Sequence, residues 1–148
     1  MSLPRWRSIL SVPINVDRFV EGAHRRQADA IQLDLEDSIP LSGKEDARGR
    51  LPQAISTVSQ GGASVIVRIN QPWRLAVRDL EAAVLPGVAA ITLPKVEDPG
   101  RVRAISETIA ELEAEVHRVY REVGTPQKDI WVVAHPVIQH ARPTADQK

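Results

Sequence analysis

Short segments rich in Val, Ile and Leu alternate along this chain with longer amphipathic segments. The amphipathic segments carry apolar residues at helical spacing, and they predict helices capped by Asn15 and starting at Lys44, Trp73 and Asp98-Pro99. The apolar segments between them predict strands over 8–12, 30–35, 64–70, 89–96 and 129–134. The resulting order, βαβαβαβαβ, implies parallel strands joined by right-handed crossovers.

Two α/β architectures have this order of elements, and periodicity does not choose between them. Five strands can form a complete doubly wound sheet of the flavodoxin type. They can also form the first part of a (β/α)₈ barrel, which typically needs about 250 residues. Either one predicts a domain over 1–134, followed by an irregular tail over 135–148, which shows no clear period.

The composition narrows the class of protein without naming a function. Hydrophobic residues make up 43% of the chain and charged residues 26%, as in an ordinary globular domain. Lys plus Arg and Asp plus Glu number 19 each, so no net charge favours nucleic acid or an anionic membrane. The absence of cysteine excludes disulfides and thiolate chemistry. The N-terminal residues do not resemble a signal peptide, so we expect a cytoplasmic protein.

Charged side chains stand where apolar strands end. The second strand runs into Asp34, Glu36 and Asp37, and the third ends in Arg68 and Asn70. The carboxyl ends of parallel strands are where ligands bind in α/β folds. We therefore expect Arg68 to lie beside Glu36, where its guanidinium can also hold a substrate carboxylate through two parallel hydrogen bonds.

Each of these residues also has a purely structural interpretation. An acidic turn after a strand is often a solvated loop or a helix cap, and Arg68 can serve a structural ion pair instead of a ligand. By themselves, Lys95 and Glu97 are expected to face solvent. Lys44 and Arg48 lie four residues apart on a helix, which indicates a solvated basic face.

Taken together, these segments resemble the HpcH/HpaI aldolase and citrate lyase β-subunit family. The resemblance covers roughly residues 5 to 97 and is nearer to the citryl-CoA and malyl-CoA lyase branch. It is carried by Arg7-Ser8, by DRFVEGAHRRQADAIQLDLEDSIP, by Lys44 with Ala47-Arg48, by VRIN and by LPKVE. Each piece alone is weakly diagnostic, whereas all of them in this order form a specific signature.

The resemblance implies a partial (β/α)₈ barrel from an enzyme that assembles as a homo-oligomer. Such enzymes break or form a carbon–carbon bond next to a carbonyl of an oxo-acid or acyl-CoA, with Mg²⁺ as cofactor. Arg68 would hold the oxo-acid and polarise its carbonyl. The resemblance implies Arg68, Glu36 and Asp37 as catalytic residues and Arg68, Arg7 and Lys44 as substrate-binding residues.

The metal site is where this chain departs from the family pattern. The resemblance implies a Glu ligand at the end of the fifth strand and an Asp ligand after the following strand. Here the fifth strand ends in Ala134 and His135, and a lone histidine makes a poor Mg²⁺ site. We therefore expect an N-terminal part of a lyase whose metal ligands are incomplete. The alternative is a non-catalytic fragment that binds a dicarboxylate or a partner subunit.

Overall fold

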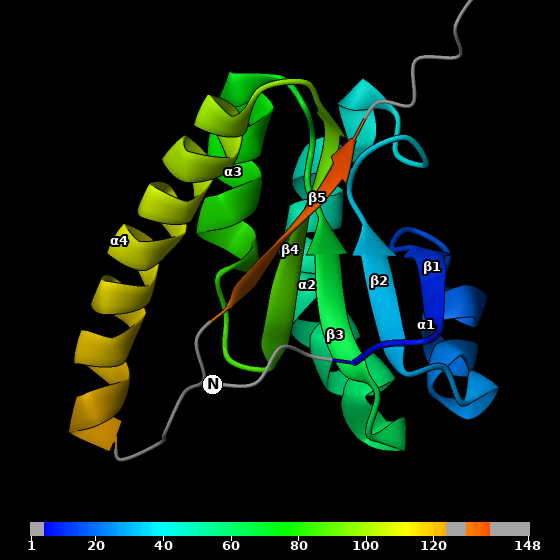
Figure 1. Cartoon of the computed structure of the whole chain (residues 1–148). Helices are drawn as coiled ribbons and strands as arrows, with labels where there is room; N and C mark the ends of the chain where they lie inside the picture. Colours follow the sequence, from blue (N-terminus) through cyan, green and yellow to red (C-terminus); the bar gives the residue numbers. More distant parts are fainter. Residues whose placement is uncertain (1–4, 124–129, 137–148) are drawn as a thin grey trace, which may run out of the picture.

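The computed structural model describes residues 5–123 and 130–136, and it contains one sheet of five parallel strands (Figure 1). The strands are β1 (Ile9–Pro13), β2 (Ala30–Asp34), β3 (Ser64–Arg68), β4 (Val88–Val96) and β5 (Trp131–Pro136). They lie in the order β1-β2-β3-β4-β5, and every neighbouring pair is parallel. The predicted α/β class and parallel sheet are therefore confirmed.

The strand order decides between the two architectures. A doubly wound sheet reverses direction after its first strands and would give the order 2-1-3-4-5. Here each crossover advances the sheet by one strand in the same direction. The flavodoxin-like alternative is therefore wrong, and the sequential order is consistent with part of a TIM-barrel-like fold.

Four helices cover one face of the sheet: α1 (Asp17–Ala23), α2 (Lys44–Val58), α3 (Trp73–Ala83) and α4 (Pro99–Val123). Short 3₁₀ turns, η1 (His24–Arg26), η2 (Leu41–Gly43) and η3 (Ser59–Gly61), lie beside them. A single apolar cluster joins the sheet to all four helices, with Ile31 of β2 and side chains such as Val20, Leu51, Leu80 and Ile105. Alternation along the strands explains this, because Ile31, Leu33, Val65 and Val67 all point to that face.

The predicted helix starts are only partly confirmed. The Asp98 carboxylate accepts hydrogen bonds from the backbone N–H groups of Gly100 and Arg101, as expected for a cap before α4. Asn15 does not cap α1, because the helix begins later and Val16 occupies the cap position without a side-chain bond.

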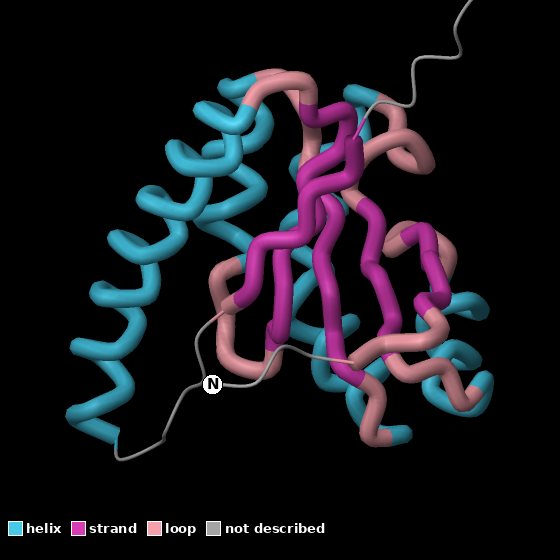
Figure 2. The backbone as a smooth tube through the Cα atoms, in the orientation of Figure 1, coloured by secondary structure: helices cyan, strands magenta, loops and turns pink. Residues whose placement is uncertain are grey.

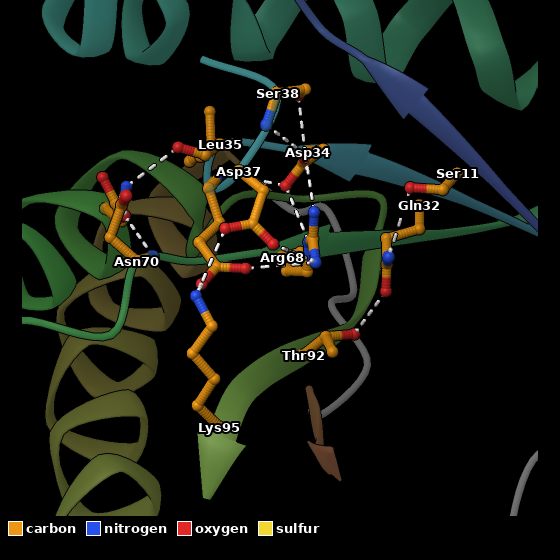
Figure 3. A network of polar contacts seen from close by, with 12 residues as sticks. Ser11, Gln32, Asp34, Leu35, Asp37, Ser38, Arg68, Asn70, Thr92 and Lys95 are labelled. Carbon is orange, nitrogen blue, oxygen red and sulfur yellow. Dashed lines mark hydrogen bonds and ion pairs between the residues drawn. The ribbon is translucent and has the colours of Figure 1, made fainter. Parts of the chain in front are cut away.

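The opposite face of the sheet carries smaller and more polar side chains. Ala30, Ile66 and Ala90 form a second buried cluster there. Nearer the carboxyl ends, the Gln32 amide donates to the Ser11 hydroxyl at 3.4 Å, and the Thr92 hydroxyl donates to the Gln32 carbonyl oxygen at 2.8 Å (Figure 3). This face therefore becomes more polar toward the charged carboxyl ends of the strands.

The loops that follow β2, β3 and β4 gather at one end of the sheet (Figure 2). β3 ends at Arg68, two residues earlier than predicted, whereas β5 continues to Pro136, two residues past the predicted boundary at 134. The rest of the predicted tail, 137–148, lies outside the described residues. Within the described ranges, no helix is long and apolar enough to cross a membrane.

Candidate active site

Arg68 and Asp34 form the centre of the charged strand ends. They are register partners on β3 and β2, so their side chains leave the sheet side by side. The Arg68 Nε donates to Asp34 Oδ1 and its Nη2 donates to Asp34 Oδ2, both at 2.8 Å (Figure 3). Two parallel bonds to a carboxylate that is only 2% exposed fix the plane of the guanidinium.

Asp34 is held in its ionised form. Burial raises its pKa and is the largest single influence, but three hydrogen bonds outweigh it and lower the pKa from 3.8 to about 2. These come from Arg68, from the Ser38 hydroxyl at 2.6 Å and from the Glu36 backbone N–H at 2.8 Å. The Arg68–Asp34 pair is therefore intact throughout the neutral pH range.

Glu36 and Asp37 bridge Arg68 to Lys95. Arg68 Nη1 lies 3.1 Å from Glu36 Oε2 and 3.4 Å from Asp37 Oδ2, which confirms the expected pairing of Arg68 with Glu36. Lys95 Nζ lies 2.8 Å from Glu36 Oε1 and 3.2 Å from Asp37 Oδ1. We call Asp34, Glu36, Asp37, Arg68 and Lys95 the charged rim. Within it, three carboxylates face two cations.

Lys95 is exposed, as expected, and the structure adds an ion pair that was not predicted. Its side chain is half exposed, yet the ammonium is paired with Glu36 and Asp37. The hydrogen bonds to these two acids raise the pKa of Lys95. The backbone reaches this position through a register shift in β4 and a left-handed φ of 52°. Because neither is visible in LPKVE as a sequence, the ion pair could not be predicted, whereas Glu97 is exposed as expected.

Lys44 and Arg48 are buried, so the interpretation of a solvated basic face is wrong. Lys44 Nζ donates to the backbone oxygens of Leu35 at 2.7 Å and Glu36 at 2.5 Å. Burial lowers the pKa of Lys44, although nearby carboxylates oppose the shift. Lys44 thus holds the backbone of the loop that carries Glu36 and Asp37 through these two hydrogen bonds.

Arg7 lies at the other end of the sheet. Its backbone N–H and Nε donate to Asp29 Oδ2 at 2.8 and 3.3 Å, and its Nη2 donates to Oδ1 at 3.1 Å. Both residues precede their strands, and in a parallel sheet the amino ends lie a full strand length from the carboxyl ends. The structure therefore does not bring Arg7 to the charged rim, where the resemblance implied a substrate-binding residue.

Asn70 and Asp79 were not recognised as partners from the sequence. The third strand was predicted to include Asn70, but β3 ends at Arg68 and Asn70 instead contacts Asp79 of α3. Asp79 is completely buried. Its spacing from Ala76 and Ala83, three and four residues, was the available signal for a buried position.

A cleft of about 310 Å³ adjoins the rim through Lys95. Arg101 lies over the indole ring of Trp73, with its guanidinium carbon 4.6 Å from the ring centroid, and donates to the Gln71 backbone oxygen. The cleft is lined by Gln71, Trp73, Lys95, Glu97, Asp98, Gly100 and Arg101. A ligand held at the rim therefore has room to extend along β4 and the start of α4.

The rim as folded is not a metal centre. Across residues 5–123 and 130–136, no three acidic or histidine side chains are grouped so that they could hold a metal ion. Glu36 and Asp37 are paired with Arg68 and Lys95, and Asp34 with Arg68. The carboxylates of the rim thus do not fit a divalent ion in this arrangement.

The fold and the charged rim define an α/β protein with a cluster of paired charges at the carboxyl end of a sequential parallel sheet. The family model for HpcH/HpaI aldolase/citrate lyase matches residues 7–135, and the chain belongs to this family. It is 35% identical over 122 residues to a citrate lyase subunit beta of Leuconostoc mesenteroides subsp. cremoris, covering 80% of this chain and 39% of that protein.

The names of two further relatives contain CoA esters. A (3S)-malyl-CoA thioesterase of Cereibacter sphaeroides is 36% identical over 110 residues, which cover 72% of this chain and 38% of that protein. A malyl-CoA/beta-methylmalyl-CoA/citramalyl-CoA lyase of Chloroflexus aurantiacus is 31% identical over 102 residues, covering 66% of this chain and 29% of that protein. The chain therefore spans less than two fifths of the length of these relatives.

Proposed function

We propose that this chain provides the oxo-acid-binding part of a carbon–carbon lyase of the citryl-CoA or malyl-CoA type. The observation that carries the proposal is the Arg68 guanidinium, oriented by Asp34 at the carboxyl end of β3. The names of the relatives, citrate lyase subunit beta and malyl-CoA lyase among them, support an oxo-acid or acyl-CoA as the ligand.

One edge of the guanidinium makes longer contacts than the other, and we infer that a ligand carboxylate binds at that edge. Asp34 occupies the edge formed by Nε and Nη2, so the edge formed by Nη1 and Nη2 points away from it. The contacts of Nη1 with Glu36 and Asp37 are longer, at 3.1 and 3.4 Å. A ligand carboxylate can replace these longer contacts and form two parallel bonds, the arrangement in which arginine binds carboxylates best.

The two cations of the rim could stabilise the negative charge that develops during the reaction. When the carbon–carbon bond forms, the ketone oxygen of the oxo-acid gains negative charge, and Arg68 would stabilise it. Lys95 contributes a second positive charge rather than a base, because Glu36 and Asp37 raise its pKa and keep it protonated. Glu36 and Asp37 would orient these two cations at the mouth of the site.

The proposal also includes Mg²⁺ dependence, closure of a (β/α)₈ barrel and self-association of the complete enzyme. Mg²⁺ would polarise the oxygens of the oxo-acid. The rim carboxylates are engaged by Arg68 and Lys95, so no metal ligand is assigned among them. The full activity would accordingly require groups beyond the rim.

The second candidate is a non-catalytic module of the same lineage that binds a dicarboxylate or a partner subunit. The charges of the rim favour it, because every acid of the rim is paired with a cation of the rim. Such a site can bind an oxo-acid through Arg68 without performing a reaction.

Turnover and binding assays separate the two functions. The purified chain would be incubated with citryl-CoA, malyl-CoA and citramalyl-CoA, with and without Mg²⁺, while released oxo-acid is measured. Calorimetry with oxaloacetate would compare the wild type with Arg68→Ala and with Arg50→Ala, a control whose guanidinium is half exposed and pairs with Asp17 and Asp46. We expect Arg68→Ala to weaken binding at least about tenfold, as loss of a charged hydrogen bond does, and Arg50→Ala to leave it unchanged.

Turnover that needs Arg68 would establish the lyase. Oxaloacetate binding that needs Arg68, without turnover, would establish the binding module. Neither heat nor turnover in the wild type would refute both functions.

A further inference from the structure

A second polar network lies beneath the charged rim, between the end of β3 and helices α2 and α3. Its centre is Asp79, whose carboxylate is completely buried. Asp79 Oδ1 accepts from Arg48 Nε at 2.8 Å, and Oδ2 accepts from the backbone N–H and the side-chain Nδ2 of Asn70 at 2.7 and 2.6 Å. A buried carboxylate is costly unless it is paired, and Arg48 supplies that pairing.

The network continues to the backbone that carries the rim acids. Asn70 Nδ2 also donates to the backbone oxygen of Leu35 at 2.9 Å. Lys44 Nζ donates to the same oxygen and to the backbone oxygen of Glu36, which accepts a further bond from the Ile39 N–H at 3.2 Å. Each of the two carbonyl groups therefore accepts two hydrogen bonds, and these bonds fix the orientation of the backbone at Leu35 and Glu36.

We propose that Asp79 is a positioning residue of the charged rim, which acts through Asn70 on the backbone at Leu35 and Glu36. Asp79 holds Asn70 by two bonds, and Asn70 shares the Leu35 oxygen with Lys44. The side chains of Glu36 and Asp37 leave this backbone to meet Arg68 and Lys95, so its direction sets their geometry. The expected effect on ligand binding rests on the proposed function.

The arrangement of contacts separates this role from simple helix packing. A packing contact between α3 and the sheet would need apolar surface only, as Leu80 and Ala83 supply. Asp79 instead presents both oxygens to donors from two other elements, α2 and the segment after β3. Loss of the network should therefore loosen the loop at Glu36 more than the rest of the fold.

The experiment compares Asn70→Ala and Asp79→Asn with Val58→Ala. Asn70→Ala removes the bond to Leu35 while the Asp79–Arg48 pair remains, so the variant retains its buried ion pair. Val58 is completely buried in the apolar cluster and makes none of the hydrogen bonds of the network, so Val58→Ala controls for general destabilisation. Amide hydrogen exchange is followed at Glu36 and Ile39, and oxaloacetate affinity is measured by calorimetry.

We expect exchange at Glu36 and Ile39 to accelerate about tenfold in Asn70→Ala and Asp79→Asn relative to Val58→Ala. The oxaloacetate Kd should rise about tenfold in the same two variants. Exchange at these amides no faster than in Val58→Ala would overturn the proposal, with or without a change in Kd. If the wild type binds no oxaloacetate, the proposed function fails, and the exchange comparison still decides whether Asp79 positions the rim.

Discussion

Replacement of Asp34 by Asn tests the central ion pair with almost no change in volume. The wild-type carboxylate accepts from Arg68 through both oxygens and also from Ser38 and the Glu36 N–H. An amide offers one acceptor oxygen, and its NH₂ group would face a donor. The variant therefore loses a charge and at least one of the two parallel bonds to Arg68.

The lowered pKa of Asp34 sets the expected magnitude. A carboxyl whose pKa falls from 3.8 in the unfolded chain to about 2 in the fold contributes about 2 kcal/mol of stability. Because the folded-state pKa is the lower one, this contribution is fully present above about pH 5. It is lost as the pH falls toward 2, and roughly half of it remains at pH 3.

The assay is urea unfolding of the wild type and Asp34→Asn at pH 7, 5, 4 and 3. We expect the variant to be less stable by about 2 kcal/mol at pH 7 and 5, and the difference to shrink at pH 3. Asp46→Asn is the matched control, because it removes the same charge from an exposed pair with Arg50 on α2. Exposed pairs contribute little, so this control should unfold at nearly the wild-type midpoint.

Two results would refute the reasoning. If Asp34→Asn were as stable as the wild type at pH 7, the attraction between Arg68 and Asp34 would not exceed the free-energy cost of burying their charges. If the difference stayed constant down to pH 3, its cause would be packing rather than ionisation of Asp34.

Two further predictions concern Arg7 and Lys95. Arg7→Ala should leave oxaloacetate binding unchanged in calorimetry, because Arg7 pairs with Asp29 at the amino end of the sheet; weakened binding would contradict that placement. Lys95→Gly should be more stable than Lys95→Ala by about 1 kcal/mol in urea unfolding, because φ is 52° there and both variants lack the ammonium. Equal stability of the two variants would contradict this prediction, because it would mean that the left-handed φ at position 95 does not destabilise a residue with a side chain.

The order of elements was predictable because each depends on nearby residues. The runs SILSV, AIQLDL and SVIVRIN are apolar and β-branched, and they form strands within about two residues of the predicted limits. The same locality explains the errors at the ends. Helix α1 begins at Asp17, with Val16 rather than Asn15 at the cap position, and β3 ends at Arg68.

The candidate site was predictable as far as strand ends determine it. Asp34 ends β2, Glu36 follows it and Arg68 ends β3, so their meeting requires only that β2 and β3 be neighbours. Lys95 and Asp79 required more, namely a left-handed residue after a register shift and a helix face turned toward Asn70. Both depend on contacts between segments distant in the sequence.

By itself, the sequence determined the alternation of strands and helices, the acids and the arginine at the strand ends, and the resemblance to the citrate lyase β-subunit family. Only the tertiary structure decided the strand order, the burial of Lys44 and Arg48, and the separation of Arg7 from the rim. The physical reason is that periodicity reports which face of an element is apolar. Which element covers that face, and which charge lies opposite, is set by the packing of the whole chain.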